Sequence, residues 1–310
     1  MSPLKFVLFC GKGGVGKTTM AASSAIYFAL SGKKTLLFST DPAHSLSDSL
    51  SQQIGSRLTG IKGVENLFAW EQDAEELMNE LKNGYGEGIL HFLTSCTYLD
   101  ETDAQDLMDL TLPGLDELMG LKQIIDYLES DQFDLYVWDA APTGHTLRLL
   151  QMPEIVDQWI KLAAQMRWKY RSMVGLLSGK DFSDRTDDFV FNLKKSIKKL
   201  NRYLTDPSIC RMIAVTIPEY MAVNELDRMS AYLKTRSFPL RHILINQVIG
   251  ADNQCLYCQN RRQEQEKYLQ RIRVHYPGFC LTEVFQRPHE VKGRENLIDL
   301  HGEICPLLGE

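Results

Sequence analysis

Three features that mark large classes of protein are missing from this sequence of 310 residues. No apolar run reaches the ~20 residues that a membrane-spanning helix needs. Basic residues are not in excess: the net charge at pH 7 is −6, which argues against a general binder of nucleic acid or of anionic membranes. A disulfide framework is not evident either, because the seven cysteines are odd in number and scattered, as is typical of reduced thiols.

A signal peptide is also missing, since the first predicted strand starts almost at Met1. The hydrophobic content of 44% and the charged content of 24% are ordinary for globular proteins. A chain of this length can bury a large core, as one domain or as one domain with an insertion. We therefore expect a soluble, cytoplasmic protein.

The strongest motif lies at the beginning of the chain, where a predicted strand leads directly into a glycine-rich loop. Phe6–Cys10 is apolar, and Gly11-x4-Gly16-Lys17-Thr18 then fits the phosphate-loop pattern. The backbone N–H groups of such a loop surround phosphates, its lysine adds positive charge, and its hydroxyl group can hold Mg²⁺. The predicted nucleotide contacts are Gly11, Lys12, Gly13, Gly14, Val15, Gly16, Lys17, Thr18 and Thr19.

Two acidic residues are expected near this loop because each follows a predicted strand. Asp41 comes after the strand expected at 35–40, and Asp139 lies at the end of the apolar run 134–141, as in a Walker B strand. Ligands of open α/β sheets bind at the carboxyl ends of the strands. The alternative is that both acids are turn residues, with Asp41 as a cap.

We assign the chemistry of phosphoryl transfer to five residues. Thr18 would hold Mg²⁺ with support from Asp139, and Lys17 and Lys12 would neutralise phosphate charge. Asp41 would orient or deprotonate the attacking water.

The order of the elements predicts an α/β fold, with a mostly parallel P-loop NTPase sheet flanked by helices. Two helical stretches are too long for simple crossovers, and we interpret them as insertions that form a helical subdomain. The predicted ATPase domain comprises 1–72, 131–152 and 206–310, and the predicted helical subdomain comprises 73–130 and 153–205.

The second insertion has apolar residues at helical spacing. From Val156 to Leu177 the apolar steps alternate between three and four, and Val190–Leu204 repeats the pattern. The simpler interpretation is that these helices pack on each other, with the lysines at 194–199 as a solvated face. A partial second stripe, formed by Ile160, Ala164 and Trp168, leaves some apolar surface over.

Cys255 and Cys258 form a Cys-x-x-Cys motif. Two thiolates are half of a tetrahedral zinc site, and a symmetric dimer would supply the same pair again. A shared zinc site, a redox pair and two unrelated thiols all remain open. The other five cysteines are interpreted as core or incidental thiols.

The motifs together resemble those of the ATPases that target tail-anchored membrane proteins, in the superfamily of the arsenite-pump ATPases. The resemblance covers nearly the whole chain. It rests on GKGGVGKTT (11–19), STDPAHSLSDSL (39–50), PGLDEL (113–118), DAAPTGHTLRLLQMP (139–153), IPEY (217–220), INQ (245–247), CLYCQNRRQEQEKYL (255–269) and EVKG (290–293).

The resemblance implies further roles for individual residues. Lys12 would reach the partner's nucleotide in a homodimer, and Glu219 and Asn246 would contact the nucleotide, with Asn246 reading the purine. Cys255 and Cys258 would hold Zn²⁺ across the dimer. The two switches that sense the γ-phosphate, 41–48 and 139–146, would include Pro42, His44, Ser45, Pro142, Thr143, Gly144 and His145.

The sequence also departs from the family pattern. Ala140 follows the Walker B acid, where the family usually has threonine. Phe285 takes the place of a proline in the adenine loop, and Pro288 comes later.

The function implied by the resemblance is that of a homodimeric Mg-ATPase, which captures the C-terminal transmembrane helix of tail-anchored proteins in an apolar groove. The groove candidates are Trp159, Ile160, Ala164, Met166, Trp168 and Met173. ATP would close the dimer, and hydrolysis would release the client at a membrane receptor. ATP, Mg²⁺ and Zn²⁺ are the expected cofactors, and nucleic acid is not an expected partner.

Three alternatives remain. The first is an ATPase subunit of an arsenite or metalloid efflux pump, which the lack of cysteines near Pro113 and after Pro153 disfavours. The second is a membrane- or DNA-positioning switch with the same loop. The third is a redox-triggered holdase that uses the same thiols.

Overall fold

The computed structural model describes residues 4–41, 45–72, 115–140, 198–250 and 255–308, together with residues 76, 161 and 195. The chain separates into two units, of which the first comprises 1–72, 131–147 and 203–310 and the second 73–130 and 148–202. Most of the second unit lies outside the described residues. The functional division into an ATPase domain and a client-binding subdomain, and all six groove candidates, therefore stay predictions.

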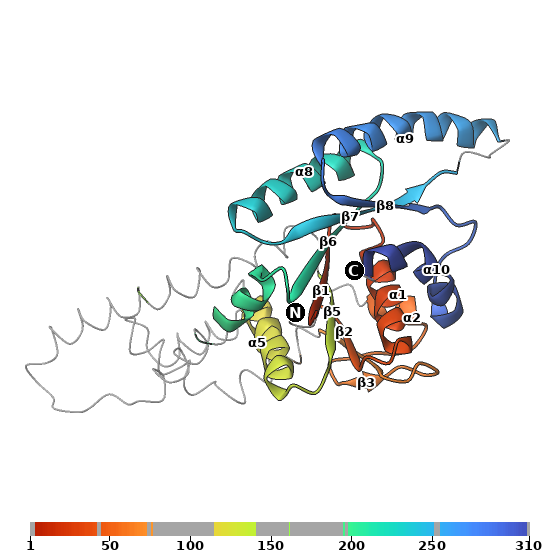
Figure 1. Cartoon of the computed structure of the whole chain (residues 1–310). Helices are drawn as coiled ribbons and strands as arrows, with labels where there is room; N and C mark the ends of the chain where they lie inside the picture. Colours follow the sequence, from red (N-terminus) through yellow and green to blue (C-terminus); the bar gives the residue numbers. More distant parts are fainter. Residues whose placement is uncertain are drawn as a thin grey trace, which may run out of the picture. The chain divides into compact units, whose positions relative to one another are not determined.

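The first unit contains an eight-stranded sheet with the order β3-β4-β2-β5-β1-β6-β7-β8 (Figure 1). Neighbouring strands pair in parallel, except for the short antiparallel pair of β3 and β4. The predicted P-loop NTPase sheet is thus confirmed. The strands are β1 (Phe6–Cys10), β2 (Thr35–Ser39), β3 (Thr59–Gly60), β4 (Leu67–Glu71), β5 (Leu135–Asp139), β6 (Cys210–Thr216), β7 (Leu240–Val248) and β8 (Cys280–Phe285).

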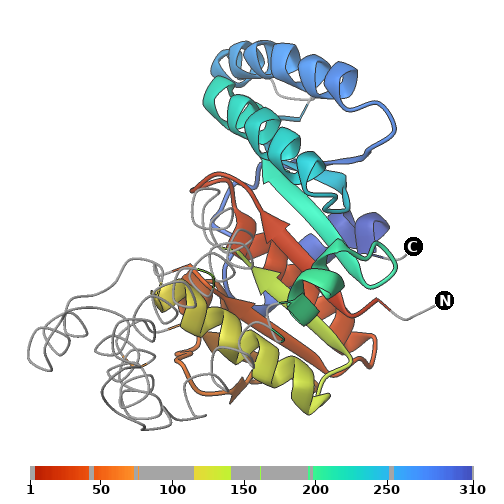
Figure 2. The same ribbon diagram turned by 90° about the vertical axis from the view of Figure 1, so that its left-hand side faces the viewer.

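Helices cover both faces of this sheet, which explains why its central strands are apolar on both sides. All five residues of β1 are buried. Helices α1 (Lys17–Leu30) and α10 (Gly293–Leu308) pack together on one face, where Ser23 Oγ donates to the carbonyl of Leu297 at 2.7 Å. Helices α8 (Tyr220–Thr235) and α9 (Leu256–His275) run side by side on the other face (Figures 1 and 2). Helix α2 (Ser45–Leu50) follows β2.

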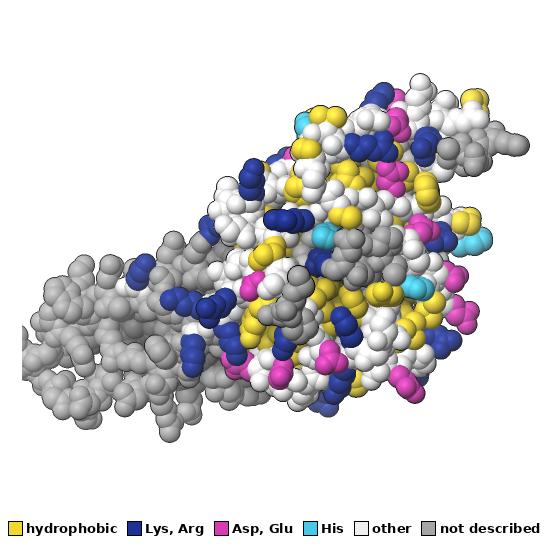
Figure 3. Space-filling model, viewed as in Figure 1, with side chains coloured by type: hydrophobic (Ala, Val, Ile, Leu, Met, Phe, Trp, Pro, Cys, Tyr) yellow, Lys and Arg dark blue, Asp and Glu magenta, His cyan; other side chains and the backbone are white. Residues whose placement is uncertain are grey.

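Helix α9 has no counterpart among the helices expected from the sequence. Its buried residues are Gln265, Leu269 and Ile272, and no residue from Cys255 to Glu264 is buried. Side chains of both charges cover the exposed part (Figure 3). Only two buried apolar residues, Leu269 and Ile272, stand at helical spacing in this segment. That stripe is too short to predict the helix from the sequence.

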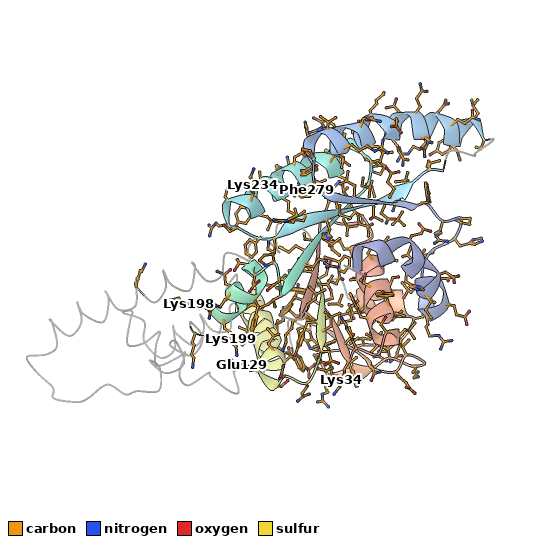
Figure 4. All side chains as sticks on the ribbon, in the orientation of Figure 1. Lys34, Glu129, Lys198, Lys199, Lys234 and Phe279 are labelled. Carbon is orange, nitrogen blue, oxygen red and sulfur yellow. The ribbon has the colours of Figure 1, made fainter. Side chains whose placement is uncertain are left out.

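The described part of the second unit is small. It includes helix α5 (Leu115–Ser130) and the helical residues 198–202. Lys199 Nζ lies 3.3 Å from Glu129 Oε1 (Figure 4), and Lys195, Lys198 and Lys199 are exposed, as expected for a solvated face. Among the helices that the structure describes, none has the length and apolar character needed to span a membrane.

Candidate nucleotide site

The phosphate loop joins β1 to α1 in the interior of the sheet, where β1 lies between β5 and β6. Asp139, the last residue of β5, pairs in register with Phe9 of β1 and with Ser39 of β2. The carboxyl ends of these three strands therefore bring the loop, Asp41 and Asp139 to one edge of the sheet, where ligands of such sheets bind.

Two glycines let the loop approach its neighbours closely. A Cβ on Gly11 would lie 2.1 Å from the carbonyl oxygen of Val215 in β6. A Cβ on Gly16, whose φ is +94°, would lie 2.4 Å from Nδ2 of Asn246. A side chain at either position would clash, so the loop depends on glycine there.

Lys17 and Thr18 open helix α1 and face different partners. The Lys17 side chain is buried, and its Nζ donates to the carbonyl of Lys12 at 3.2 Å, so its charge is kept inside the loop. Thr18 Oγ1 donates to Asp139 Oδ2 at 2.8 Å and lies 3.0 Å from Ser45 Oγ, the first residue of α2. The loop, the Walker B acid and Ser45 of the first switch thus meet at Thr18.

Asp139 is fully buried, and burial raises its pKa to about 6, against the lowering effects of the Thr18 hydrogen bond and the Lys17 charge. Its Oδ2 also accepts a hydrogen bond from Ser39 Oγ at 3.1 Å. Its Oδ1 has no hydrogen-bond partner among the described residues. A buried carboxylate oxygen of this kind, next to a threonine hydroxyl, fits a Mg²⁺ ion with its bound water.

Asp41 lies two residues beyond β2 and is half-buried. Its backbone N–H donates to Ser39 Oγ at 3.1 Å, which ties it to the residue that also contacts Asp139. Of the predicted switch residues, Ser45 is described, whereas Pro42, His44, Pro142, Thr143, Gly144 and His145 lie outside the described residues.

Glu71 is a structural partner of the site that the sequence motifs did not reveal. This buried residue ends β4, where its Oε1 accepts from the backbone N–H of Leu46 at 2.7 Å and its Oε2 from Ser47 Oγ at 2.9 Å. It therefore holds the first turn of α2 beside Thr18. The sequence does contain a signal that could have pointed to Glu71. The apolar run 67–71 ends in an acidic residue, as the Walker B run does.

The two predicted nucleotide contacts beyond the loop lie near β6 and β7. Glu219 precedes α8, and its Oε1 accepts a hydrogen bond from the guanidinium group of Arg261 in α9. Asn246 in β7 donates from Nδ2 to the carbonyl of Val15 at 2.9 Å, so it contacts the phosphate loop directly. Phe285 ends β8 with 48% of its surface exposed.

Cys255 and Cys258 lie at the beginning of α9, with Cys255 exposed and Cys258 half-buried. Hydrogen bonds to Cys258, through its backbone and thiol, and to the backbone of Tyr257 lower the pKa of Cys255, which favours the thiolate that binds metal. No group of three or more metal-binding side chains occurs within the described residues. The pair fits half of a tetrahedral zinc site.

The fold and the strand–loop–helix arrangement define the protein as a P-loop nucleoside triphosphatase. Comparison with known proteins narrows this class. Residues 4–305 match the model of the family described as anion-transporting ATPase, so the chain belongs to this family and is an ATP hydrolase, as the sequence predicts.

Individual relatives match along most of their lengths. ATPase ASNA1 homolog 1 of Paramecium tetraurelia is 34% identical, over 98% of this chain and 92% of the relative. ATPase GET3B of Arabidopsis thaliana is 36% identical, over 87% of this chain and 70% of the relative. ATPase GET3 of Phaeosphaeria nodorum is 32% identical, over 95% of this chain and 92% of the relative. The resemblance inferred from the motifs is thereby confirmed at the level of the family.

Proposed function

We propose that this chain is a cytoplasmic, homodimeric Mg-ATPase that captures the C-terminal transmembrane helix of tail-anchored proteins and delivers it to a membrane receptor. The observation that carries the proposal is the full-length relationship to GET3 and ASNA1 ATPases, in a chain whose first switch contacts the phosphate-loop residue Thr18 through Ser45. The second unit, inserted twice into the ATPase unit, is the proposed site of the client groove.

Hydrolysis would take place at the edge of the sheet described above. Thr18 and Asp139 would hold Mg²⁺, which when bound neutralises charge on the phosphate oxygens. Lys17 supplies positive charge from within the loop, and Lys12 would supply it to the nucleotide of the partner subunit. Asp41 would accept the proton of the attacking water.

The first switch provides a physical connection between hydrolysis and client release. The side chains of Ser45 and Thr18 are in hydrogen-bond contact, and Glu71 holds the N–H of Leu46. A change in the ligands of Thr18 would therefore directly alter the position of the first turn of α2. We infer that loss of the γ-phosphate shifts this segment and opens the dimer.

The proposal is tested by co-expressing the chain with a client protein that has a C-terminal transmembrane segment. We expect a soluble complex that is lost when the segment is deleted, because the apolar helix itself is the ligand. The same client with its segment moved to the N-terminus serves as the matched control. No capture, together with ATPase activity that arsenite stimulates, would instead support the metalloid-pump alternative.

The cysteine pair gives a separate prediction about the dimer. Replacing both Cys255 and Cys258 by serine should remove bound zinc and shift the nucleotide-free protein toward the monomer, since serine is a poor zinc ligand. Light scattering after size exclusion and metal analysis would measure both effects. Cys280→Ser, at another exposed cysteine, is the control. An unchanged dimer with unchanged zinc would show that the pair has another role.

A further inference from the structure

Strand β7 is irregular beside Asn246, the proposed base contact. Its register against β8 shifts between Ile245 and Val248, so the ladder skips Asn246 and Gln247. Gln247 has a φ of +58°, in the left-handed region that residues other than glycine seldom adopt. Strained backbone of this kind persists where the surrounding structure holds it.

A glutamine from α9 holds this segment. Gln265 is 4% exposed, its Nε2 donates to the carbonyl of Gln247 at 2.9 Å, and its Oε1 accepts from the backbone N–H of Ile249 at 2.9 Å. The guanidinium group of Arg262 donates to the carbonyl of Ile249. One buried amide thus satisfies two polar backbone groups, those of Gln247 and Ile249, just where the ladder resumes at Val248 after its interruption.

The same irregular segment sets the direction of the Asn246 amide. Asn246 Oδ1 accepts from the backbone N–H of Gln247 at 2.8 Å, and its Nδ2 donates to Val15 in the phosphate loop at 2.9 Å. Oδ1 can accept one more hydrogen bond, and Nδ2 can donate one more. A side-chain amide that offers both is complementary to the N7 and N6 edge of adenine, whereas guanine presents two acceptors there.

We propose that Gln265 is a positioning residue for nucleotide selection. By holding the Gln247 peptide in its left-handed conformation, it keeps the Asn246 amide against the phosphate loop and turned to the base. Gln265 itself acts only through this peptide and through Asn246. The proposal rests on the base-reading role that the family resemblance implies for Asn246.

The test compares ATP with GTP in steady-state hydrolysis. Gln265→Met keeps the length of the side chain but removes both hydrogen bonds. We expect KM for ATP to rise about tenfold and the preference for ATP over GTP to fall by a similar factor, with kcat changed less than about threefold, because binding geometry is lost and not chemistry. Gln263→Met, at an exposed position of the same helix, is the control and should change neither value.

A rescue experiment separates positioning from general stability. Gln247→Gly added to Gln265→Met should restore part of the preference for ATP, because glycine adopts the positive φ without strain. If Gln265→Met does not fold, Gln265→Glu retains the acceptor for Ile249 while removing the donor to Gln247. It should show the same loss of preference.

The outcomes also distinguish this proposal from the one on which it rests. An Asn246→Ala variant that loses the preference for ATP, beside folded Gln265 variants that keep it, would overturn the role of Gln265 alone. An Asn246→Ala variant with unchanged preference would overturn the base contact itself, and the role of Gln265 with it.

Discussion

Asp41→Asn should lower the kcat of ATP hydrolysis by about 10² to 10⁴, the range expected when a general base is removed. Asparagine keeps the shape of the side chain and can still accept a hydrogen bond, but it cannot take the proton of water at neutral pH. KM for Mg·ATP should change little, because the loop contacts come from other residues. A steady-state assay at several ATP concentrations measures both values.

The matched control is Asp299→Asn, which removes an exposed acid from helix α10, away from the site. It should leave kcat unchanged. If the proposed cycle is right, Asp41→Asn should also still capture a client while releasing it slowly. Hydrolysis at the wild-type rate in Asp41→Asn would show that Asp41 is a turn residue and not the base.

The part of the fold nearest the phosphate loop could be predicted from the sequence because its signals are local. The strand expected at 6–10 is β1. The apolar run 134–141, with Asp139 as its Walker B acid, contains β5. A buried strand in a parallel sheet appears as a short, continuous apolar run, and a phosphate loop has fixed glycine spacing. These signals do not depend on residues far away in the chain.

The missed features depend on distant contacts. Helix α9 is held by a few residues, among them a buried glutamine whose partners lie in and just after β7, so its sequence contains almost no apolar period. Glu71 and Ser39 join the site because β4, β2 and β5 are neighbours, and that order is a property of the assembled sheet. Asn246 was predicted to read the base, but its contact with Val15 could not be inferred from spacing.

Asp139→Asn should have opposite effects on stability and on activity. Burial raises the pKa of this carboxyl group from 3.8 in its unperturbed state to about 6. Between these two pH values the unfolded chain loses its proton before the native protein does, so the native protein loses stability as the pH rises. Above about pH 6 the nucleotide-free protein keeps a buried charge that Thr18, Ser39 and Lys17 compensate only in part, and asparagine removes this charge. The variant should therefore be more stable at pH 8 by on the order of 1–3 kcal/mol.

The ATPase activity of the same variant should fall by roughly a hundredfold or more. Mg²⁺ stabilises the transition state by several kcal/mol, and the variant lacks the Asp139 carboxylate that supports the ion. Urea unfolding without nucleotide, at pH 8 and at pH 4, measures the first effect, and Mg-dependent turnover measures the second. The gain in stability should nearly vanish at pH 4, where the native carboxyl group is already protonated. Asp299→Asn, at an exposed acid of α10, is the control. A loss of stability at pH 8 would show instead that the carboxylate stabilises the empty site, through its bonds with Thr18 and Ser39.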